Sequence, residues 1–470
     1  MRCQLPLALL AATLAPTALA AGKYAVDWDR LQPEIFEHYS DLIRIDTSSP
    51  PGNETKAAEY LKKVLDREGI PAQIYELEPG RGNVIARLKG NGSKRPILLM
   101  GHLDVVGVQR EKWTVDPFSA LRKDGYVYGR GSIDDKDKVT TVLMVMLLLK
   151  RQKVPLDRDV IFLGEAGEEG GANVGIGFMV GRHWDEIACE YALTEGGSMI
   201  SRDGKVRTVE IATTEKVPRG VRLVAHGQAG HGSRPRLDNA VAHLAQAVWK
   251  ASANQPPMRL NDTTRTYFER LATVSTPEAA DRYTHLTDPA RTAAIQAYFA
   301  EHEQTHYSIL RTSVVPTILK AGFRSNVIPS EAEATLDIRA LPDEDMPKFY
   351  GWLKKLIDDP AVEIVPNRAG EREPGAPSRI DSALFRAFEA AQREMFPGAI
   401  TLPSMLTGAT DNAQLRAKGV QAYGFGPIID EKEVAAGGGA HGDDERLKED
   451  SLYKEVQFIW RSVIQVVNSQ

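Results

Sequence analysis

The chain of 470 residues is too long for one ordinary domain, so two or three folded units are expected. Its 42% hydrophobic and 26% charged residues are typical of a globular protein with large buried cores. The net charge of −5, without a basic stripe, argues against nucleic acid as a partner.

The first residues have the pattern of an export signal. A basic start at Arg2 precedes an apolar stretch over 5–19, which ends in a small-residue cleavage sequence at 18–20. The stretch is short and contains two prolines, so stable membrane insertion is not expected. We predict that residues 1–20 are a signal peptide cleaved near Ala20, and that the protein is periplasmic or secreted.

Helical and strand patterns alternate after the leader. Helical spacing of apolar residues predicts two helices within 29–70, separated by a polar turn, and another helix after Asp135. Short apolar runs predict strands at 72–77, 83–88, 96–100, 159–163 and 191–194. Continuous apolar runs are typical of strands in a sheet that is covered on both faces. The alternation predicts an α/β sheet.

The pattern changes after about residue 212. Residues 221–226 and 331–339 alternate between apolar and polar positions, which favours half-exposed antiparallel strands. We therefore predict that 213–368 is a second domain, inserted into a first domain that comprises 21–212 and 369–470.

Metal-binding side chains follow three of the predicted strands. His102, Glu169 and Glu195 each come shortly after an apolar run. Because ligands of an α/β sheet gather at the carboxyl ends of its strands, these side chains are expected to meet. Each residue taken alone also has an interpretation without a metal. His102 could be a structural partner of Asp104, and Glu195 could be an ordinary surface residue.

Asp134 and His441 extend this set. One Asp carboxylate has two oxygens and can hold two cations, although Asp134–Asp135 also suits the start of the following helix. His441 stands in the glycine-rich segment 437–442, which by itself is equally typical of an exposed loop. Histidine and carboxylate ligands without a thiolate suit Zn²⁺, with Co²⁺ or Mn²⁺ as substitutes.

Two further motifs contain groups suited to catalysis. The adjacent carboxylates of Glu168 and Glu169 repel each other, but a metal would accept one while the other takes a proton from bound water. Glu165 competes for either role. His231, in the turn motif 230–235, either stabilises that turn or donates a hydrogen bond to a developing oxyanion.

These segments, in this order, resemble the co-catalytic di-zinc family that includes aminoacylase, carboxypeptidase S, glutamate carboxypeptidase and the dinuclear dipeptidases. The resemblance runs from about residue 30 to the C-terminus, interrupted by an insert at 256–307. The shared motifs are Gly-His-x-Asp-Val-Val at 101–106, Gly-Arg-Gly-Ser-x-Asp-Asp-Lys at 129–136, Glu-Glu-x-Gly at 168–171 and Gly-Ala-His at 439–441.

The resemblance implies a mixed central sheet flanked by helices, with an inserted α+β domain that serves as lid and dimerisation surface. It implies that Asp134 bridges two Zn²⁺ ions. His102 and Glu195 would complete one site, and Glu169 and His441 the other.

The resemblance also implies roles for the neighbours of these ligands. Glu168 would be the general base, Asp104 would orient His102, and His231 would act on the centre of a neighbouring subunit. The peptide bond between Asp134 and Asp135 is expected to be cis. The segments that match the family near the substrate contain Asn326, Arg339, Gly408 and Thr410.

Two positions depart from the family pattern without removing a ligand. Asp137 stands where glycine is usual and adds negative charge near the metals, and Asp444 stands where asparagine is common. We therefore expect hydrolysis of the amide bond of a small peptide or an N-acyl amino acid, with a homodimer formed through the lid. The alternatives are a metal-dependent hydrolase of non-peptide amides or esters, and a catalytically silent binding protein.

Overall fold

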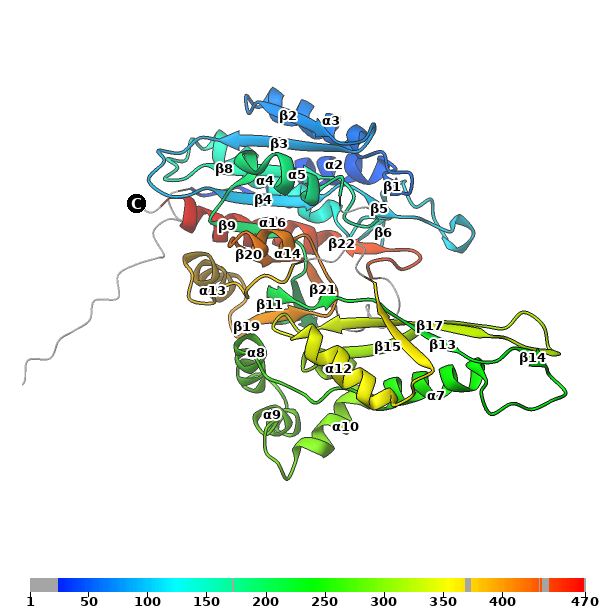
Figure 1. The fold of residues 1–470 in the computed structure, drawn as a ribbon. Coiled ribbons are helices and arrows are strands. Elements are labelled where there is room, and N and C mark those ends of the chain that lie inside the picture. Colours follow the sequence, from blue (N-terminus) through cyan, green and yellow to red (C-terminus); the bar gives the residue numbers. More distant parts are fainter. Residues whose placement is uncertain (1–23, 171–172, 368–372, 431, 433–438, 469–470) are drawn as a thin grey trace, which may run out of the picture.

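The structure, a computed structural model, describes residues 24–170, 173–367, 373–430, 432 and 439–468 (Figure 1). The predicted signal peptide lies outside these ranges. Within them, none of the helices combines the length and the apolar character needed to cross a bilayer.

The body of the molecule is a ten-stranded sheet with helices on both faces. Its strands are β2 (Ala72–Glu76), β3 (Gly82–Leu88), β4 (Ile97–His102), β8 (Val160–Glu165), β9 (Tyr191–Thr194), β10 (Ser198–Arg202), β11 (Lys205–Glu215), β19 (Ile400–Leu406), β20 (Gln421–Gly424) and β21 (Ile428–Asp430). Its helices are α2 (Trp28–Arg44), α3 (Glu54–Arg67), α4 (Lys136–Arg151), α5 (Ile176–Arg182), α6 (Trp184–Ile187), α13 (Ala383–Met395), α14 (Asn412–Ala417) and α16 (Glu449–Val467).

The strand order is β2-β3-β8-β4-β9-β20-β11-β10-β21, and β19 pairs with β11. The central strands β8, β4, β9 and β20 are parallel, whereas β2, β3 and the β10–β11 hairpin introduce antiparallel pairs. The structure therefore confirms the predicted mixed sheet flanked by helices.

Alternation along the central strands explains the two helical layers. Successive side chains of a strand point to opposite faces. Leu99 and Phe162 pack with α2, α4, α13 and α16 on one face, and Leu98 and Leu163 pack with α5 and α14 on the other. All four side chains are fully buried, which explains why these strands are continuously apolar.

Short strand pairs connect the loops at the edge of the body. They are β1 (Ser48–Ser49) with β5 (Val105–Val106), and β6 (Leu121–Lys123) with β7 (Tyr126–Tyr128) and β22 (Arg446–Lys448). Because β22 pairs with β7, the late segment that contains His441 is held beside the motif at 129–136.

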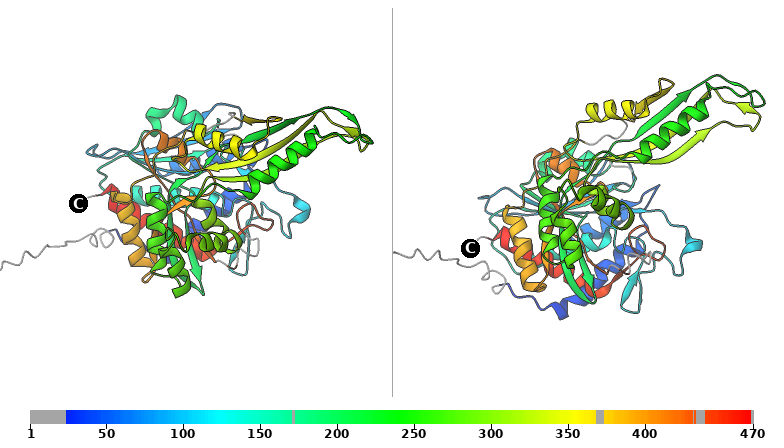
Figure 2. Two further views of the ribbon diagram at one scale, coloured as in Figure 1. Left: turned by 60° about the horizontal axis from the view of Figure 1, so that its bottom comes forward. Right: turned by 90° about the horizontal axis from the view of Figure 1, so that it is seen from below.

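A smaller five-stranded sheet extends from the body as an arm, which we call the lid (Figure 2). Its elements are β12 (Val217–Pro218), β13 (Val221–His226), α7 (Ala240–Ala253), β15 (Ser313–Ala321), β17 (Glu331–Ala340), α12 (Met346–Ile357) and β18 (Val362–Pro366), with a pair of short strands, β14 (Gly230–His231) and β16 (Val327–Ile328), at its tip. The strands are antiparallel, and their buried positions pack against α7 and α12.

The insert at 256–307 packs on the body, although the sequence analysis grouped it with the inserted domain. It forms α8 (Asp262–Ala272), α9 (Pro277–Thr284), α10 (Thr292–His302) and α11 (Gln304–Ile309), the last of which extends to Ile309. Phe268 and Phe299 form one apolar cluster with Leu402 and Met405 of β19. These helices cover the apolar side of β19, which the sequence pattern of the insert alone does not reveal.

Candidate metal centre

The candidate ligands lie at one edge of the central sheet. His102 is the last residue of β4, Glu195 directly follows β9, and Glu169 lies in the turn after β8. Since β4 pairs in parallel with both β8 and β9, these three segments leave the sheet side by side. Asp134 and Asp135 immediately precede α4, beneath the same edge.

Asp134 stands between two groups of ligand atoms. Its Oδ1 atom lies 2.9 Å from His102 Nε2, and its Oδ2 atom lies 3.1 Å from His441 Nε2. His441 Nε2 is also 2.7 Å from Glu169 Oε1.

Each group is compact enough to hold one ion. Ligand atoms of His102, Asp134, Asp135 and Glu195 lie within 4.8 Å of one another, and so do those of Asp134, Glu169 and His441. The structure thus brings together all five side chains that the sequence analysis singled out, and adds Asp135. The peptide bond between Asp134 and Asp135 is cis, which confirms that expectation.

The local backbone explains two of the motif residues. A side chain at Gly101 would place its Cβ atom 2.7 Å from Asp135 Oδ2, so only glycine allows Asp135 to accept the His102 N–H at 3.1 Å. His441 has a φ of +63°, a left-handed conformation that histidine adopts more readily than most residues. Asp444 anchors this segment by accepting hydrogen bonds from the N–H and hydroxyl of Thr114, at 2.8 and 2.7 Å.

Buried ion pairs support the Asp134 turn. Glu445 pairs with Arg130 and accepts the Ile133 N–H at 2.8 Å, which joins the late segment to the earlier motif. The Lys138 ammonium lies 3.1 Å from Asp135 and 3.2 Å from Asp137. Burial raises the pKa of Asp137 to about 8, and the adjacent Lys138 ammonium opposes this shift.

Asp104 lies behind His102, where the sequence analysis placed it, and also contacts a second segment. His102 Nδ1 lies 3.0 Å from the backbone carbonyl oxygen of Asp104 but 3.5 Å from its carboxylate, so the carbonyl accepts the ring N–H. The carboxylate accepts the backbone N–H groups of Glu168 and Glu169, at 3.1 and 3.0 Å. Burial opposes its ionisation, but His102 and these two N–H groups hold the pKa of Asp104 below its usual value.

The charges of the cluster fit two divalent cations. Hydrogen bonds to Asp134 and Glu169 raise the pKa of His441 to about 10, and burial together with the Asp134 charge raises the pKa of Glu195 well above its usual value. The His441 shift reflects the adjacent carboxylates of Asp134 and Glu169, and the Glu195 shift reflects burial first and the Asp134 charge second. Divalent ions would compensate the same carboxylates, since ligation requires neutral imidazoles and ionised carboxylates.

Glu165 and Glu168 differ in their surroundings. Glu165 is buried, and burial followed by the charge of Asp411 raises its pKa well above the usual value. Among the described residues, its carboxylate belongs to neither group of clustered ligand atoms. The Glu168 charge is among the causes that raise the pKa of Glu195, so the Glu168 carboxylate lies near the cluster.

Two of the expected catalytic and substrate contacts lie far from this cluster within the same chain. His231 is on β14 and Asn326 directly precedes β16, so both lie at the tip of the lid (Figure 1). The Gly232 N–H donates to the Asn326 carbonyl at 2.8 Å, which holds the two segments together. Arg339 is on β17, where its Nε lies 2.9 Å from the Asp337 carboxylate.

Gly408 and Thr410 lie between β19 and α14, next to the cluster. Thr410 is buried, and both its hydroxyl and its backbone N–H donate to the carboxylate of Glu215. Glu215 also pairs with Arg416, and the sequence analysis missed both residues. Neither belongs to a motif: one ends a strand and the other lies within a short helix, where single charged residues are usual.

A helix-flanked sheet with two imidazoles and several carboxylates gathered at one edge is the arrangement expected of a metal-dependent hydrolase. Residues 98–465 match the model of peptidase family M20/M25/M40, and the chain belongs to that family.

Relatives in this family act on amide bonds. N-fatty-acyl-amino acid synthase/hydrolase PM20D1 of Xenopus tropicalis is 27% identical over 444 residues, which cover 92% of this chain and 85% of that protein. Aminoacylase-1 of Mus musculus is 27% identical over 428 residues, which cover 90% and 92%. The M20 family metallo-carboxypeptidase Sso-CP2 of Sulfolobus solfataricus shares the fold, with a TM-score of 0.69 at 18% identity over 92% of this chain and 100% of that one. The chain is therefore a hydrolase of amide bonds.

Proposed function

We propose that the protein is a zinc-dependent hydrolase of small peptides or N-acyl amino acids that acts after export from the cytoplasm. The observation that carries this proposal is the Asp134 carboxylate, whose two oxygens face His102 on one side and His441 on the other. The donor set of imidazoles and carboxylates without a thiolate favours zinc, and the N-terminal leader favours a periplasmic or secreted location.

Two divalent ions in this site would polarise the scissile carbonyl and lower the pKa of a water molecule. Glu168 is the base that takes the proton of this water and returns it to the leaving amine. The Asp104 carboxylate fixes the turn that carries Glu168, because it accepts the N–H groups of Glu168 and Glu169. The backbone that carries both the ligand Glu169 and the base Glu168 is therefore held by one carboxylate.

The lid supplies the hydrogen-bond donor for the developing oxyanion. The Ser233 N–H and hydroxyl lie 3.1 and 2.7 Å from His231 Nδ1, and the N–H donates to this atom, so the ring proton is on Nε2. This N–H is exposed at the tip of the lid and can donate to a substrate oxygen. Because the tip lies away from the centre of its own chain, we propose that His231 serves the centre of a second subunit.

Exposed apolar residues on the lid support such a dimer. β15 is an edge strand of the lid sheet, and edge strands readily pair with another chain. Val315, Ile318 and Leu319 of this strand are 52%, 49% and 62% exposed, and Phe323 beyond it is 81% exposed. Exposed apolar side chains on an edge strand are typical of a protein interface.

Hydrolysis rates on dipeptides and N-acyl amino acids, with and without a chelator, test the proposal. We expect hydrolysis of at least one of these classes, loss of activity on chelation and recovery with Zn²⁺. The variant Glu168→Gln should bind the metals but lose most of its activity, because removal of a general base costs about 10²- to 10⁴-fold. Activity that survives chelation, or full activity of Glu168→Gln, would contradict the proposal.

A further inference from the structure

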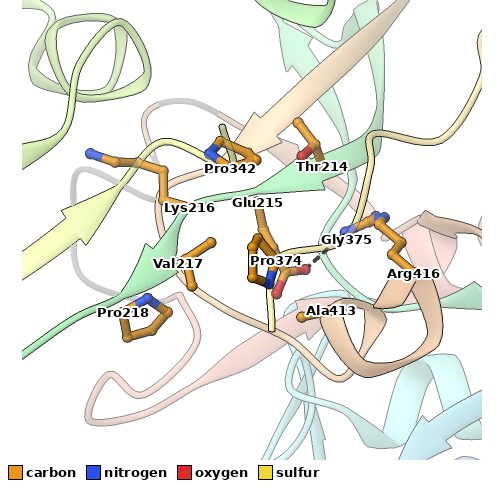
Figure 3. Close-up of a pocket in the computed structure, with 10 residues that line it drawn as sticks. All are labelled: Thr214, Glu215, Lys216, Val217, Pro218, Pro342, Pro374, Gly375, Ala413 and Arg416. Atoms are coloured by element: carbon orange, nitrogen blue, oxygen red, sulfur yellow. Dashed lines mark hydrogen bonds and ion pairs between the residues drawn. The ribbon is translucent and has the colours of Figure 1, made fainter. Parts of the chain in front are cut away.

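One of the chain connections between body and lid runs through Glu215 and Lys216, whose side chains point in opposite directions (Figure 3). Glu215 ends β11 of the body, and Lys216 directly precedes β12 of the lid. Neighbouring side chains of an extended segment point to opposite sides. The Lys216 ammonium donates to the carbonyl and hydroxyl of Ser308, both at 3.0 Å, and to the hydroxyl of Ser313 at 2.8 Å, where β15 of the lid begins.

Glu215 points the other way and is bound by three donors. Its carboxylate accepts the Thr410 N–H at 2.9 Å and the Thr410 hydroxyl at 2.8 Å. It also accepts a hydrogen bond from Arg416 Nη1 at 3.0 Å (Figure 3). The Glu215 and Arg416 side chains are only 5% and 2% exposed, so this is a buried ion pair with fixed geometry. The carboxylate therefore sets the position of Thr410.

Hydrogen bonds continue from Thr410 to the metal centre. The Asn412 N–H donates to the Thr410 hydroxyl oxygen at 3.3 Å, and Asn412 Nδ2 donates to the backbone carbonyl of Glu195 at 3.2 Å. The two segments are also in close contact, because a Cβ atom at Gly196 would lie 2.5 Å from Leu406 and 3.6 Å from Thr410. The segment that Glu215 holds is thus packed against the segment that carries Glu195.

We infer that Glu215, at the root of the lid, is a positioning residue that holds the metal ligand Glu195 through Thr410 and Asn412. This inference rests on the proposed function, because it takes Glu195 as a ligand. Partners that orient a metal ligand typically change metal affinity about 10- to 100-fold when they are removed. The effect should be confined to the ion that His102 and Glu195 bind, because none of these hydrogen bonds involves Glu169 or His441.

The pair Thr410→Val and Thr410→Ser tests this path in the full chain. Valine has the shape of threonine but no hydroxyl, so it removes the donor to Glu215 and the acceptor for Asn412. Serine restores the hydroxyl. Thr401→Val is the matched control, since Thr401 is a buried threonine of β19 whose hydroxyl lies beside Gln392. Release of Zn²⁺ from the loaded protein to a chromophoric chelator is followed together with KM, kcat and thermal unfolding.

We expect Thr410→Val to lower the affinity for one of the two ions about 10- to 100-fold. The affinities of Thr410→Ser and Thr401→Val should stay close to those of the wild type. Glu215→Gln should lower the affinity for the same ion. It should also unfold at a lower temperature, because it leaves Arg416 buried without its charged partner. The inference is overturned if Thr410→Val keeps both ions and only KM rises, if serine fails to restore binding, or if both ions are lost in step with unfolding. A wild-type chain that binds no metal would instead refute the proposed function itself.

Discussion

Replacement of Asp104 by asparagine tests how the centre is supported. The carboxylate accepts two backbone N–H groups, from Glu168 at 3.1 Å and Glu169 at 3.0 Å. Asparagine keeps one acceptor oxygen, but its NH₂ group then faces the other N–H. One buried donor is left without an acceptor, which costs about 1–3 kcal/mol. Since about 1.4 kcal/mol is a factor of ten, the turn is destabilised about 5- to 150-fold.

Asp104→Asn should weaken the binding of one ion and impair the general base Glu168. Glu169 and Glu168 lie on the destabilised turn, so we expect one ion to bind at least about tenfold more weakly and kcat to fall. The ion held by His102 should be retained, because His102 Nδ1 donates to the main-chain carbonyl of Asp104, which the substitution leaves in place.

The transfer of Zn²⁺ to a chelator should occur in two phases, one for each ion. Measuring these phases together with kcat tests both effects of Asp104→Asn. The control is Asp116→Asn, which changes an exposed turn where Asp116 accepts the Phe118 N–H at 3.0 Å. Equal weakening of the two ions, or wild-type behaviour of both, would refute this account of Asp104.

Three further predictions concern Lys216 at the junction of body and lid, the core of the central sheet, and the subunit arrangement. Burial, with the charges of Arg339 and Arg311, lowers the pKa of Lys216 from 10.5 to about 7, so between these pH values the unfolded chain binds more protons than the folded one. The free energy of unfolding should therefore rise with pH over this window, by up to about 1.4 kcal/mol per pH unit. Urea titrations at a series of pH values should show this slope in the wild type but not in Lys216→Met. An unchanged slope in the variant would contradict the prediction. Leu99→Ala, at a fully buried position of β4, should lower the free energy of unfolding by about 2–5 kcal/mol, and a change below about 1 kcal/mol in urea titrations would count against the described core. Coexpressed His231→Ala and Glu168→Gln chains should recover activity that neither homodimer has, because one site in each mixed dimer then has both groups; no recovery in purified mixed dimers would show that His231 does not act across subunits.

The sequence predicted the sheet well because its central strands are buried on both faces. A strand such as 96–100 has no polar positions, and such a continuous apolar run is easy to recognise in a sequence. The candidate ligands were found because they follow such strands, and the resemblance to a family arranged them into two groups. The packing of the helices over 262–309 was not predicted, since it depends on the apolar side of β19, about a hundred residues later in the chain.

Contacts to the backbone were also beyond the reach of sequence patterns. Asp104 lies behind His102 as expected, with its carboxylate 3.5 Å from Nδ1, but its backbone carbonyl is the nearer acceptor at 3.0 Å. Its carboxylate also accepts the Glu168 N–H, which was not predicted. Such a choice between two acceptors of the same residue depends on the path of the chain, which spacing does not specify. The same holds for Glu215, whose partners Thr410 and Arg416 lie 195 and 201 positions later in the chain.

Counting metal ions per chain in the wild type and in Asp134→Ala tests the central claim most directly. Because Asp134 faces both groups of ligand atoms, we predict that the zinc-loaded wild type contains two ions per folded chain by elemental mass spectrometry and that Asp134→Ala loses both. Asp116→Ala, at an exposed turn, should retain two. An Asp134→Ala chain that is folded and still carries two ions would contradict a dinuclear centre built around this carboxylate.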